Sequence, residues 1–493
     1  MALFTPREIA RDFIYVSFSR MVSLVISFVR SLIIPGLLGP LSYGIWKSLS
    51  MIQTYAQFGD FGARAALRRE IPFYAGKGDM ERLAASRDVA FLVNNLSILV
   101  AGVATVAAAF FVDDRGLGRA MLLFLPLLYT AHINSFMEQL LYSKKDFGWM
   151  SRLNMWTGVL EALLAIGMTW VMGLPGLILG TALSYTIATW MQVRRVGYDL
   201  HLRWDRGVFK ELVKVGFPSH LNGLLYNIFL WVDRWLILSF LGLTSFGYYA
   251  LGMTINEYLF QFSYALGNII SPHLVERYSE REKVEDLRKM VEVPMIIISR
   301  VAPAVLGAVY FASEAIVRTM LPKFEPGLVA LQVLLVGTFF SSVPRGLSSF
   351  FITLRKQAQT VALYLFAIGM NAALVWWLIS SGHGLAGAAA GTTTTLALFG
   401  FGLIVMALRY FMGVKEIALF VAGLIWPLLL GLGLVWVGHA VSEGVIGADA
   451  SGPRLVAGPV AGAALFLAAY SPVLWFLYRS YGSHLATPDG GTA

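Results

Sequence analysis

The chain contains 493 residues, of which 57% are apolar and 14% are charged, and its formal net charge is +9. Soluble globular domains carry about 25% charged residues, so this composition excludes an ordinary soluble protein and indicates an integral membrane protein. The chain has no cysteine, which excludes disulfides, thiol catalysis and cysteine-ligated metals.

Fourteen apolar windows recur along the chain, each close to the roughly 20 residues that cross a bilayer as a helix. They predict an all-α polytopic membrane protein and leave no room for a separate soluble domain. In chain order the predicted spans cover residues 12–36, 43–63, 88–112, 120–142, 148–172, 175–194, 213–241, 247–270, 293–319, 328–353, 358–380, 384–408, 417–439 and 455–478.

The basic residues between the spans are distributed unevenly. Of the 38 lysines and arginines, 28 fall on one set of alternate loops and 5 on the opposite set. Cytoplasmic loops collect Lys and Arg in this way, so a multi-pass membrane protein with both termini in the cytoplasm is predicted. The positive net charge therefore marks loops beside membrane lipids, and we expect no nucleic-acid partner.

Two stretches of the sequence repeat one another. Residues 35–51 (PGLLGPLSYGIWKSLSM) recur as 238–254 (LSFLGLTSFGYYALGMT), which maps Gly39 onto Gly242 at an offset of 203. The pattern Gly-x3-Gly-Thr that opens the sixth span also opens the twelfth, at an offset of 211. Spans 1–6 and 7–12 are therefore predicted to be two copies of one six-helix unit.

Because six is an even number, the two copies share one orientation in the membrane. Two parallel six-helix bundles with a central cavity between them are typical of alternating-access transporters, although a purely structural duplication is the alternative. We expect an N-terminal lobe at residues 1–200, a C-terminal lobe at 201–412, and two additional spans with a cytoplasmic tail at 413–493.

Several longer segments resemble a known family. They are LGPLSYGIWKSLSMIQTYAQFGDFGARAALRREIPFYAGKGD in the first hairpin, VGFPSHLNGLLYNIFLWVDRWLILSFLGLTSFGYYALG in spans 7 and 8, and LPKFEPGLVALQVLLVGTFF leading into span 10. This wording, spread over about residues 10–410, resembles bacterial oligosaccharide flippases of the polysaccharide-transporter family. That family lies in the multidrug/oligosaccharidyl-lipid/polysaccharide exporter superfamily, which also holds MATE multidrug exporters and the lipid II flippase.

The resemblance implies a function. It implies translocation of an undecaprenyl-diphosphate-linked oligosaccharide from the inner to the outer leaflet of the bacterial cytoplasmic membrane for cell-surface polysaccharide biosynthesis, driven by an ion gradient of H⁺ or Na⁺. It also implies work beside a polysaccharide polymerase and other assembly proteins, with no cofactor beyond the coupling ion.

Five basic residues lie inside predicted spans: Arg20, Arg30, Lys47, Arg234 and Arg345. A cation facing lipid at mid-membrane costs about 2.5 kcal/mol or more, so these side chains should face protein or water. We expect them to line a cationic cavity that receives the diphosphate, because guanidinium groups match phosphate oxygens. Snorkelling of the long side chains to the interface is the alternative.

Four carboxylates are embedded as well: Glu138, Glu161, Asp233 and Glu257. A carboxylate in a low dielectric is either protonated or paired, so each is a candidate for ion coupling or gating, with Glu161 the first choice for coupling. A structural ion pair with one of the five cations is the alternative for each. Since the offset of 203 maps Arg30 onto Asp233, these two are predicted to approach one another when the outer mouth closes.

A basic cluster follows the second span. Arg64, Arg68 and Arg69 fall on one helical face. This pattern predicts either an anchor on anionic lipid or a docking point for a diphosphate headgroup.

Other functions were weighed against these charges. A multidrug exporter of organic cations calls for an acidic cavity, whereas five embedded cations against four carboxylates favour an anionic substrate. A lipid II flippase would share fourteen spans and a cationic cavity. A membrane polymerase or ligase needs a catalytic outer loop, but residues 439–455 offer only His439, Glu443 and Asp449. With no metal-ligand spacing and no glycine-rich phosphate loop, we expect neither an enzyme nor a metal site.

Overall fold

A computed structural model describes residues 6–144, 146–197, 199–281, 283–354, 356–446 and 454–485. Within these ranges the side chains of residues 6–18, 20, 147, 219, 261–273, 275, 281, 357, 446, 454 and 481–485 are not described. The chain divides into two compact units, Met1–Asn227 and Ile228–Ala493, and each is described by itself.

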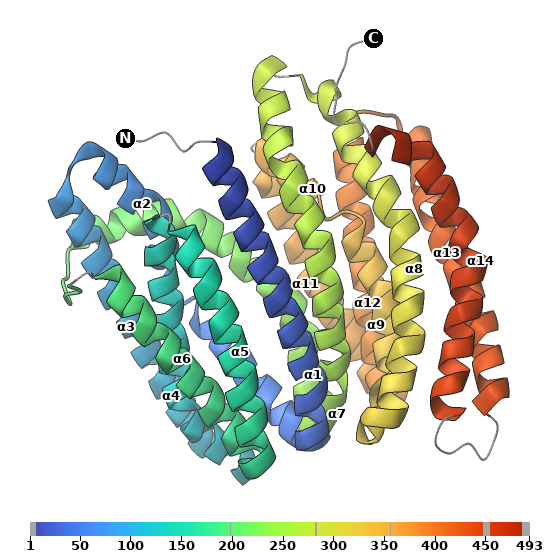
Figure 1. Ribbon diagram of the computed structural model, residues 1–493, viewed down its shortest axis with the longest axis horizontal. Helices are drawn as coiled ribbons and strands as arrows, with labels where there is room; N and C mark the ends of the chain where they lie inside the picture. Colours follow the sequence, from blue (N-terminus) through green and yellow to red (C-terminus); the bar gives the residue numbers. More distant parts are fainter. Residues whose placement is uncertain are drawn as a thin grey trace. The chain divides into compact units, whose positions relative to one another are not determined.

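The first unit is built from helices of the N-terminal half (Figure 1). Helix α5 packs against α1 and α6, α4 packs against α3 and α6, and the short α2 lies against α3 and α4. Its elements are α1 (Pro6–Ala56), α2 (Ala63–Lys77), α3 (Met80–Phe111), α4 (Arg115–Ser143), α5 (Phe147–Met172), α6 (Leu174–Val196) and the start of α7 (Arg206–Arg281).

The second unit contains the rest of α7 and all later elements. Helix α12 packs against α9 and α11, and the last two helices, α13 and α14, pack side by side against α8 (Figure 1). Its further elements are η1 (Val284–Leu287), α8 (Arg288–Met320), η2 (Pro322–Gly327), α9 (Leu328–Ser342), α10 (Leu347–Thr353), α11 (Gln357–Leu378), η3 (Ile379–His383), α12 (Gly384–Leu408), α13 (Val414–Ile446) and α14 (Arg454–Leu485).

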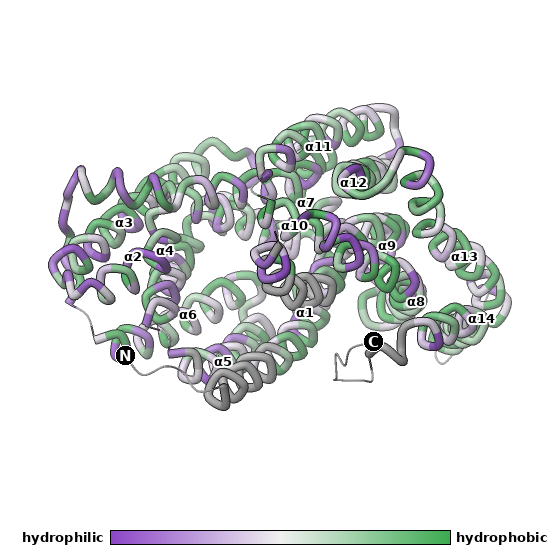
Figure 2. The backbone as a smooth tube through the Cα atoms, turned by 90° about the horizontal axis from the view of Figure 1, so that it is seen from above, coloured by the Kyte–Doolittle hydropathy of each residue, from purple (hydrophilic) through white to green (hydrophobic). Residues whose placement is uncertain are grey.

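Aspartate side chains cap the N-termini of two helices. The Asp79 carboxylate accepts a hydrogen bond from the backbone N–H of Arg82 at the start of α3, and Asp114 accepts one from Leu117 at the start of α4. Such side-chain caps satisfy backbone donors that have no partner in the first turn. The helix interiors between these caps are apolar, and green residues predominate along α11 and α13 (Figure 2).

Eleven helical segments of the described residues are long and apolar enough to cross a membrane. Three of them, Met21–Ala56, His220–Phe260 and Ala358–Leu408, contain an internal break at a glycine of positive φ. Counting each of these three as two helices gives the fourteen spans that the sequence predicts. The prediction of an all-α protein with fourteen transmembrane helices is confirmed, whereas the cavity between the lobes and the lobe boundaries stay predictions.

The sequence repeat corresponds to a repeat of backbone conformation. Gly39 (φ 73°, ψ 171°) breaks α1, and Gly242 (φ 80°, ψ 177°) breaks α7 in the same way at the offset of 203. At the offset of 211, Gly173 (φ 63°, ψ −137°) precedes α6 and Gly384 (φ 53°, ψ −137°) begins α12. Glycine populates these left-handed values at low cost, which accounts for its presence in both copies of each turn.

The start of α7 belongs to the first unit because it packs closely on the turn before α2. A Cβ atom on Gly216 would lie 2.0 Å from the carbonyl oxygen of Gly62, so the two backbones are in direct contact. Tyr74 of α2 donates a hydrogen bond of 2.7 Å to Glu211 of α7. That bond to a carboxylate, together with burial, raises the pKa of Tyr74 to about 12.

The tenth predicted span differs from the prediction. It is broken, because α9 ends at Ser342 and α10 begins at Leu347, with Pro344 and Arg345 in the turn between them. Proline cannot donate its backbone nitrogen to a helix, so the break falls at this residue.

Candidate functional site

In the first unit, two residues predicted for different roles contact one another. The Arg30 guanidinium of α1 forms an ion pair with the Glu161 carboxylate of α5. Both side chains are partly buried, 26% and 21% exposed. Ser23 bonds to the Asn154 carbonyl at the same sequence separation of 131, so α1 and α5 run parallel in register here. Glu161 is therefore neutralised by a neighbouring cation, as the ion-pair alternative expects.

Glu138 of α4 lies on the helix face that packs against α2. On either side of it, Ser135 accepts a hydrogen bond of 3.0 Å from Arg64, and Gln139 accepts one of 2.5 Å from Arg68. Arg64 also lies 3.4 Å from the buried Asp60. These two arginines therefore fasten α2 to α4. The third basic residue of the predicted cluster, Arg69, has a side chain that is 74% exposed.

The other two predicted cavity cations of the first unit, Lys47 and Arg20, both lie on α1. Lys47 Nζ lies 5.5 Å from the centre of the Tyr43 ring, one turn earlier on α1, so its charge lies within range of an aromatic ring. Arg20 is part of α1, but its side chain lies outside the described residues.

In the second unit, Asp233 is the centre of a buried polar cluster. Its carboxylate accepts hydrogen bonds from the Tyr249 hydroxyl at 2.5 Å, the Thr392 hydroxyl at 3.0 Å and the backbone N–H of Arg234 at 2.8 Å. Tyr249 and Thr392 also contact one another at 3.2 Å. Asp233 is 1% exposed, so three oxygen groups from α7 and α12 converge in a site closed to solvent.

Arg234 and Glu257, both on α7, form an ion pair across the break at Gly242. Arg234 Nη2 lies 3.1 Å from the Glu257 carboxylate, and the guanidinium stacks on Trp231 at 4.0 Å from the ring centre. Arg234 is 6% exposed while Glu257 is 47% exposed, so the pair joins a buried cation to an accessible carboxylate.

Arg345 lies in the turn between α9 and α10. Its guanidinium is 6.0 Å from the centre of the Phe260 ring of α7. Breaks of this kind in membrane helices occur where backbone lines a cavity or a binding site.

Some functional candidates were missed from the sequence. Tyr249 and Thr392 join Asp233 only through the packing of α7 on α12. Glu314 lies within the ninth predicted span but was not counted among the embedded carboxylates, and it lies beside Arg318, His439 and Glu443. The sequence did carry a signal for Glu314, because it is a carboxylate inside the apolar window of residues 293–319.

Of the predicted site residues, the structure therefore joins Arg30 with Glu161, and Arg234 with Glu257. It gives Asp233 partners within its own unit, so its predicted approach to Arg30 across the units stays a prediction. The roles of all nine residues also stay predictions.

Known structures share this fold. The lipid II flippase MurJ in an inward closed conformation superposes with a TM-score of 0.71 at 12% identity, covering 95% of this chain and 99% of that chain. An inward-facing MATE family multidrug transporter of the MOP superfamily gives 0.66 at 16% identity, covering 83% and 98%. A MOP superfamily transporter from Pyrococcus furiosus gives 0.56 at 14%, covering 83% and 96%. A search of curated protein sequences gave no match.

Fourteen membrane helices in two repeated halves, superposing on these proteins, define the class: a polytopic membrane protein with the fold of MOP superfamily transporters. A family match of the sequence assigns the chain to one family within this class. Residues 33–325, more than half of the chain, match the family described as Polysaccharide biosynthesis protein, and the chain belongs to that family.

Proposed function

We propose that this protein is a flippase that moves a polyprenyl-diphosphate-linked oligosaccharide across the bacterial cytoplasmic membrane for cell-surface polysaccharide biosynthesis. Membership of the polysaccharide biosynthesis family and the MOP superfamily fold support this proposal. Transport then proceeds by alternating access of the two lobes, with both chain termini in the cytoplasm, and the protein performs no covalent chemistry.

The observation that carries the choice of an anionic substrate is the position of Arg345. This guanidinium lies in a turn that interrupts a membrane span and faces an aromatic ring 6.0 Å away. An arginine inside a span is costly unless it faces protein or water, and its fork of donors matches phosphate oxygens. Arg345 is therefore a candidate to bind the diphosphate, as are Arg30 and Arg234, which also lie inside spans.

For the coupling ion, the structure favours Asp233 over Glu161. The carboxylate of Glu161 is neutralised by Arg30, whereas Asp233 is surrounded by the hydroxyl groups of Tyr249 and Thr392. Hydroxyl and carboxylate oxygens are the ligands that hard cations prefer, and a buried carboxylate also binds a proton. We therefore place H⁺ or Na⁺ coupling at Asp233.

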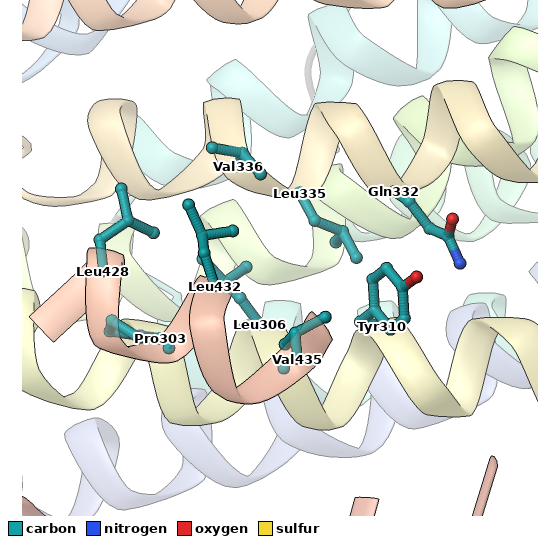
Figure 3. A pocket seen from close by; sticks show the side chains of 11 residues that line it. Pro303, Leu306, Tyr310, Gln332, Leu335, Val336, Leu428, Leu432 and Val435 are labelled. Carbon is teal, nitrogen blue, oxygen red and sulfur yellow. The ribbon is translucent and has the colours of Figure 1, made fainter. Parts of the chain in front are cut away.

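A mostly apolar pocket of the second unit suits the lipid part of the substrate. It lies between α8, α9 and α13 and is lined by side chains such as Leu306, Val336 and Leu432, with the Gln332 amide at one end beside Tyr310 (Figure 3). A polyprenyl chain is a branched hydrocarbon, and its methyl-bearing units can make van der Waals contacts with this apolar lining.

The proposal is tested by reconstitution. The purified protein in liposomes, supplied with a polyprenyl-diphosphate-linked oligosaccharide, should move the sugar to the opposite leaflet, where a membrane-impermeant glycosidase cleaves it. Arg345→Ala should lower the initial rate at least tenfold and Arg345→Lys less, because lysine keeps the charge but loses the bidentate fork. Lys323→Ala, at an exposed basic residue of the same unit, is the matched control and should keep the rate.

Lipid II is the second candidate substrate. The lipid II flippase MurJ shares this fold over 95% of the chain, which makes lipid II the substrate to compare with the oligosaccharide. Both lipids carry a polyprenyl diphosphate, so the same assay distinguishes them by the sugar: faster transfer of lipid II than of a longer oligosaccharide would identify lipid II as the substrate.

A further inference from the structure

Four charged or titratable side chains meet between α8 and α13, beside Tyr310 of the apolar pocket, whose ring centre lies 6.0 Å from that of His439. Glu314 and Arg318 lie one turn apart on α8, and His439 and Glu443 lie one turn apart on α13. Arg318 contacts the carboxylates of Glu314 at 3.2 Å and Glu443 at 2.9 Å, and His439 Nδ1 lies 3.6 Å from Glu314.

Glu314 is the unusual member of this cluster. It is 0% exposed, and neither of its carboxylate oxygens has a hydrogen bond within the described part of the protein. Nδ1 of His439, which points at Glu314, is also buried without a hydrogen bond. Buried polar groups are nearly always satisfied, as the carboxylate of Asp233 is by three donors. The Glu314 carboxylate and the His439 nitrogen therefore face one another with charged neighbours but with no hydrogen bond among the described residues.

We propose that Glu314, His439 and Glu443 bind a divalent transition metal ion such as Zn²⁺. One imidazole nitrogen and two carboxylate oxygens are a ligand set that zinc accepts, with water completing the coordination. The three ligand atoms lie within 4.8 Å of one another, and in a tetrahedral zinc site they would be about 3.3 Å apart. Small rotations of the two α13 side chains, which are exposed at 38% and 48%, would close that difference.

The electrostatics of this place favour a cation. Both α8 and α13 end close to the cluster, at Met320 and Ile446, and helix C-termini carry partial negative charge. Two carboxylates and one guanidinium leave a net negative charge when His439 is neutral. Arg318 occupies part of the site as a competing cation, and its side chain, 20% exposed, must turn outward when the metal binds.

The bound ion would fasten α13 to α8. The sequence shows no metal-ligand spacing for this site, because Glu314 lies far from His439 along the chain. The tie would add to the apolar contacts of Phe311, Phe466 and Tyr470 that already hold the last two helices on α8. This inference does not rest on the flippase proposal, since it concerns the attachment of the added helix pair.

The test is a zinc titration of the full-length protein in detergent, with any purification tag removed, followed by isothermal calorimetry. One Zn²⁺ per chain should bind, and His439→Gln and Glu314→Gln should each weaken binding at least tenfold. His383→Gln, at an exposed histidine of the same unit, is the matched control and should bind within twofold of the parent. Co²⁺ should bind in place of zinc with visible absorption bands that His439→Gln abolishes.

Arg318→Gln provides an independent test that leaves the three proposed ligands in place. Removing the competing cation should tighten zinc binding at least threefold. The proposal is overturned if the parent protein binds no zinc at 100 µM free metal, a concentration far above the dissociation constants of structural zinc sites. It is equally overturned if zinc binds with unchanged affinity in the ligand variants, or if Arg318→Gln binds no more tightly than the parent.

Discussion

The close packing of α5 on α6 makes Gly180→Ala a sharp test of the fold. A Cβ atom at Gly180 would lie 2.6 Å from the Leu164 carbonyl oxygen and 2.9 Å from its carbon, both backbone atoms of α5. Ordinary contact begins at 3.4 Å, so the two helices would have to separate by about 0.8 Å. Overpacking of this kind costs about 1–3 kcal/mol, which for a chain of 493 residues corresponds to a Tm about 1–3 °C lower.

The repeat supplies the controls for this experiment. At the offset of 211, Gly391 is the counterpart of Gly180, but its nearest neighbours are 3.1 Å away and include a side-chain methyl group of Val375 that can move. Gly391→Ala should therefore cost about 1 kcal/mol or less. Gly167 of α5 has nothing within 4 Å, so Gly167→Ala should leave the Tm unchanged or slightly raised.

The assay is thermal unfolding in detergent, followed by the loss of monodisperse protein on size-exclusion chromatography. The expected order of Tm is Gly167→Ala, then Gly391→Ala, then Gly180→Ala. Equal Tm values for Gly180→Ala and Gly167→Ala would refute the α5–α6 packing described above.

Three further predictions concern coupling and topology. Thr392→Val removes the hydroxyl group that donates a hydrogen bond to Asp233, and it should weaken the dependence of transport on an ion gradient. Thr395→Val is the control, because its hydroxyl bonds to a backbone carbonyl of the same helix, and it should keep that dependence. Equal loss in both variants would contradict an ion site at Asp233. Glu161→Gln should lower the transport rate but keep its gradient dependence, and loss of that dependence would return the coupling role to Glu161. Because the chain has no cysteine, a single cysteine at Ser42 should react with an impermeant thiol reagent in intact cells and one at Ser279 only after lysis; the reverse pattern would invert the predicted orientation.

The spans, the turns and the repeat could be predicted from the sequence because each depends on local chemistry. An apolar window of fixed length is required to cross a bilayer, and a glycine of positive φ is required at each paired turn, so both leave a signal at a fixed place in the chain. The break of the tenth span also had a local signal in Pro344, which the apolar window concealed.

The pairing of the embedded charges could not be predicted in this way. Glu161 is the partner of Arg30 because α1 packs in register on α5, and Glu314 meets His439 because α13 packs on α8. These contacts depend on which helix faces are buried together, and hydrophobic periodicity does not specify the neighbour of a helix that is apolar all round. The sequence therefore predicted which charges needed partners, but not which partners they have.

The measurement that tests the flippase proposal most directly is the transfer of a polyprenyl-diphosphate-linked oligosaccharide across liposomes containing the wild-type protein, with and without an imposed gradient of H⁺ or Na⁺. We expect transfer well above that of protein-free liposomes, faster with the gradient, and absent for an organic-cation dye. Transfer of the dye without transfer of the lipid-linked sugar would contradict the proposal and identify the protein as a multidrug exporter of the same fold.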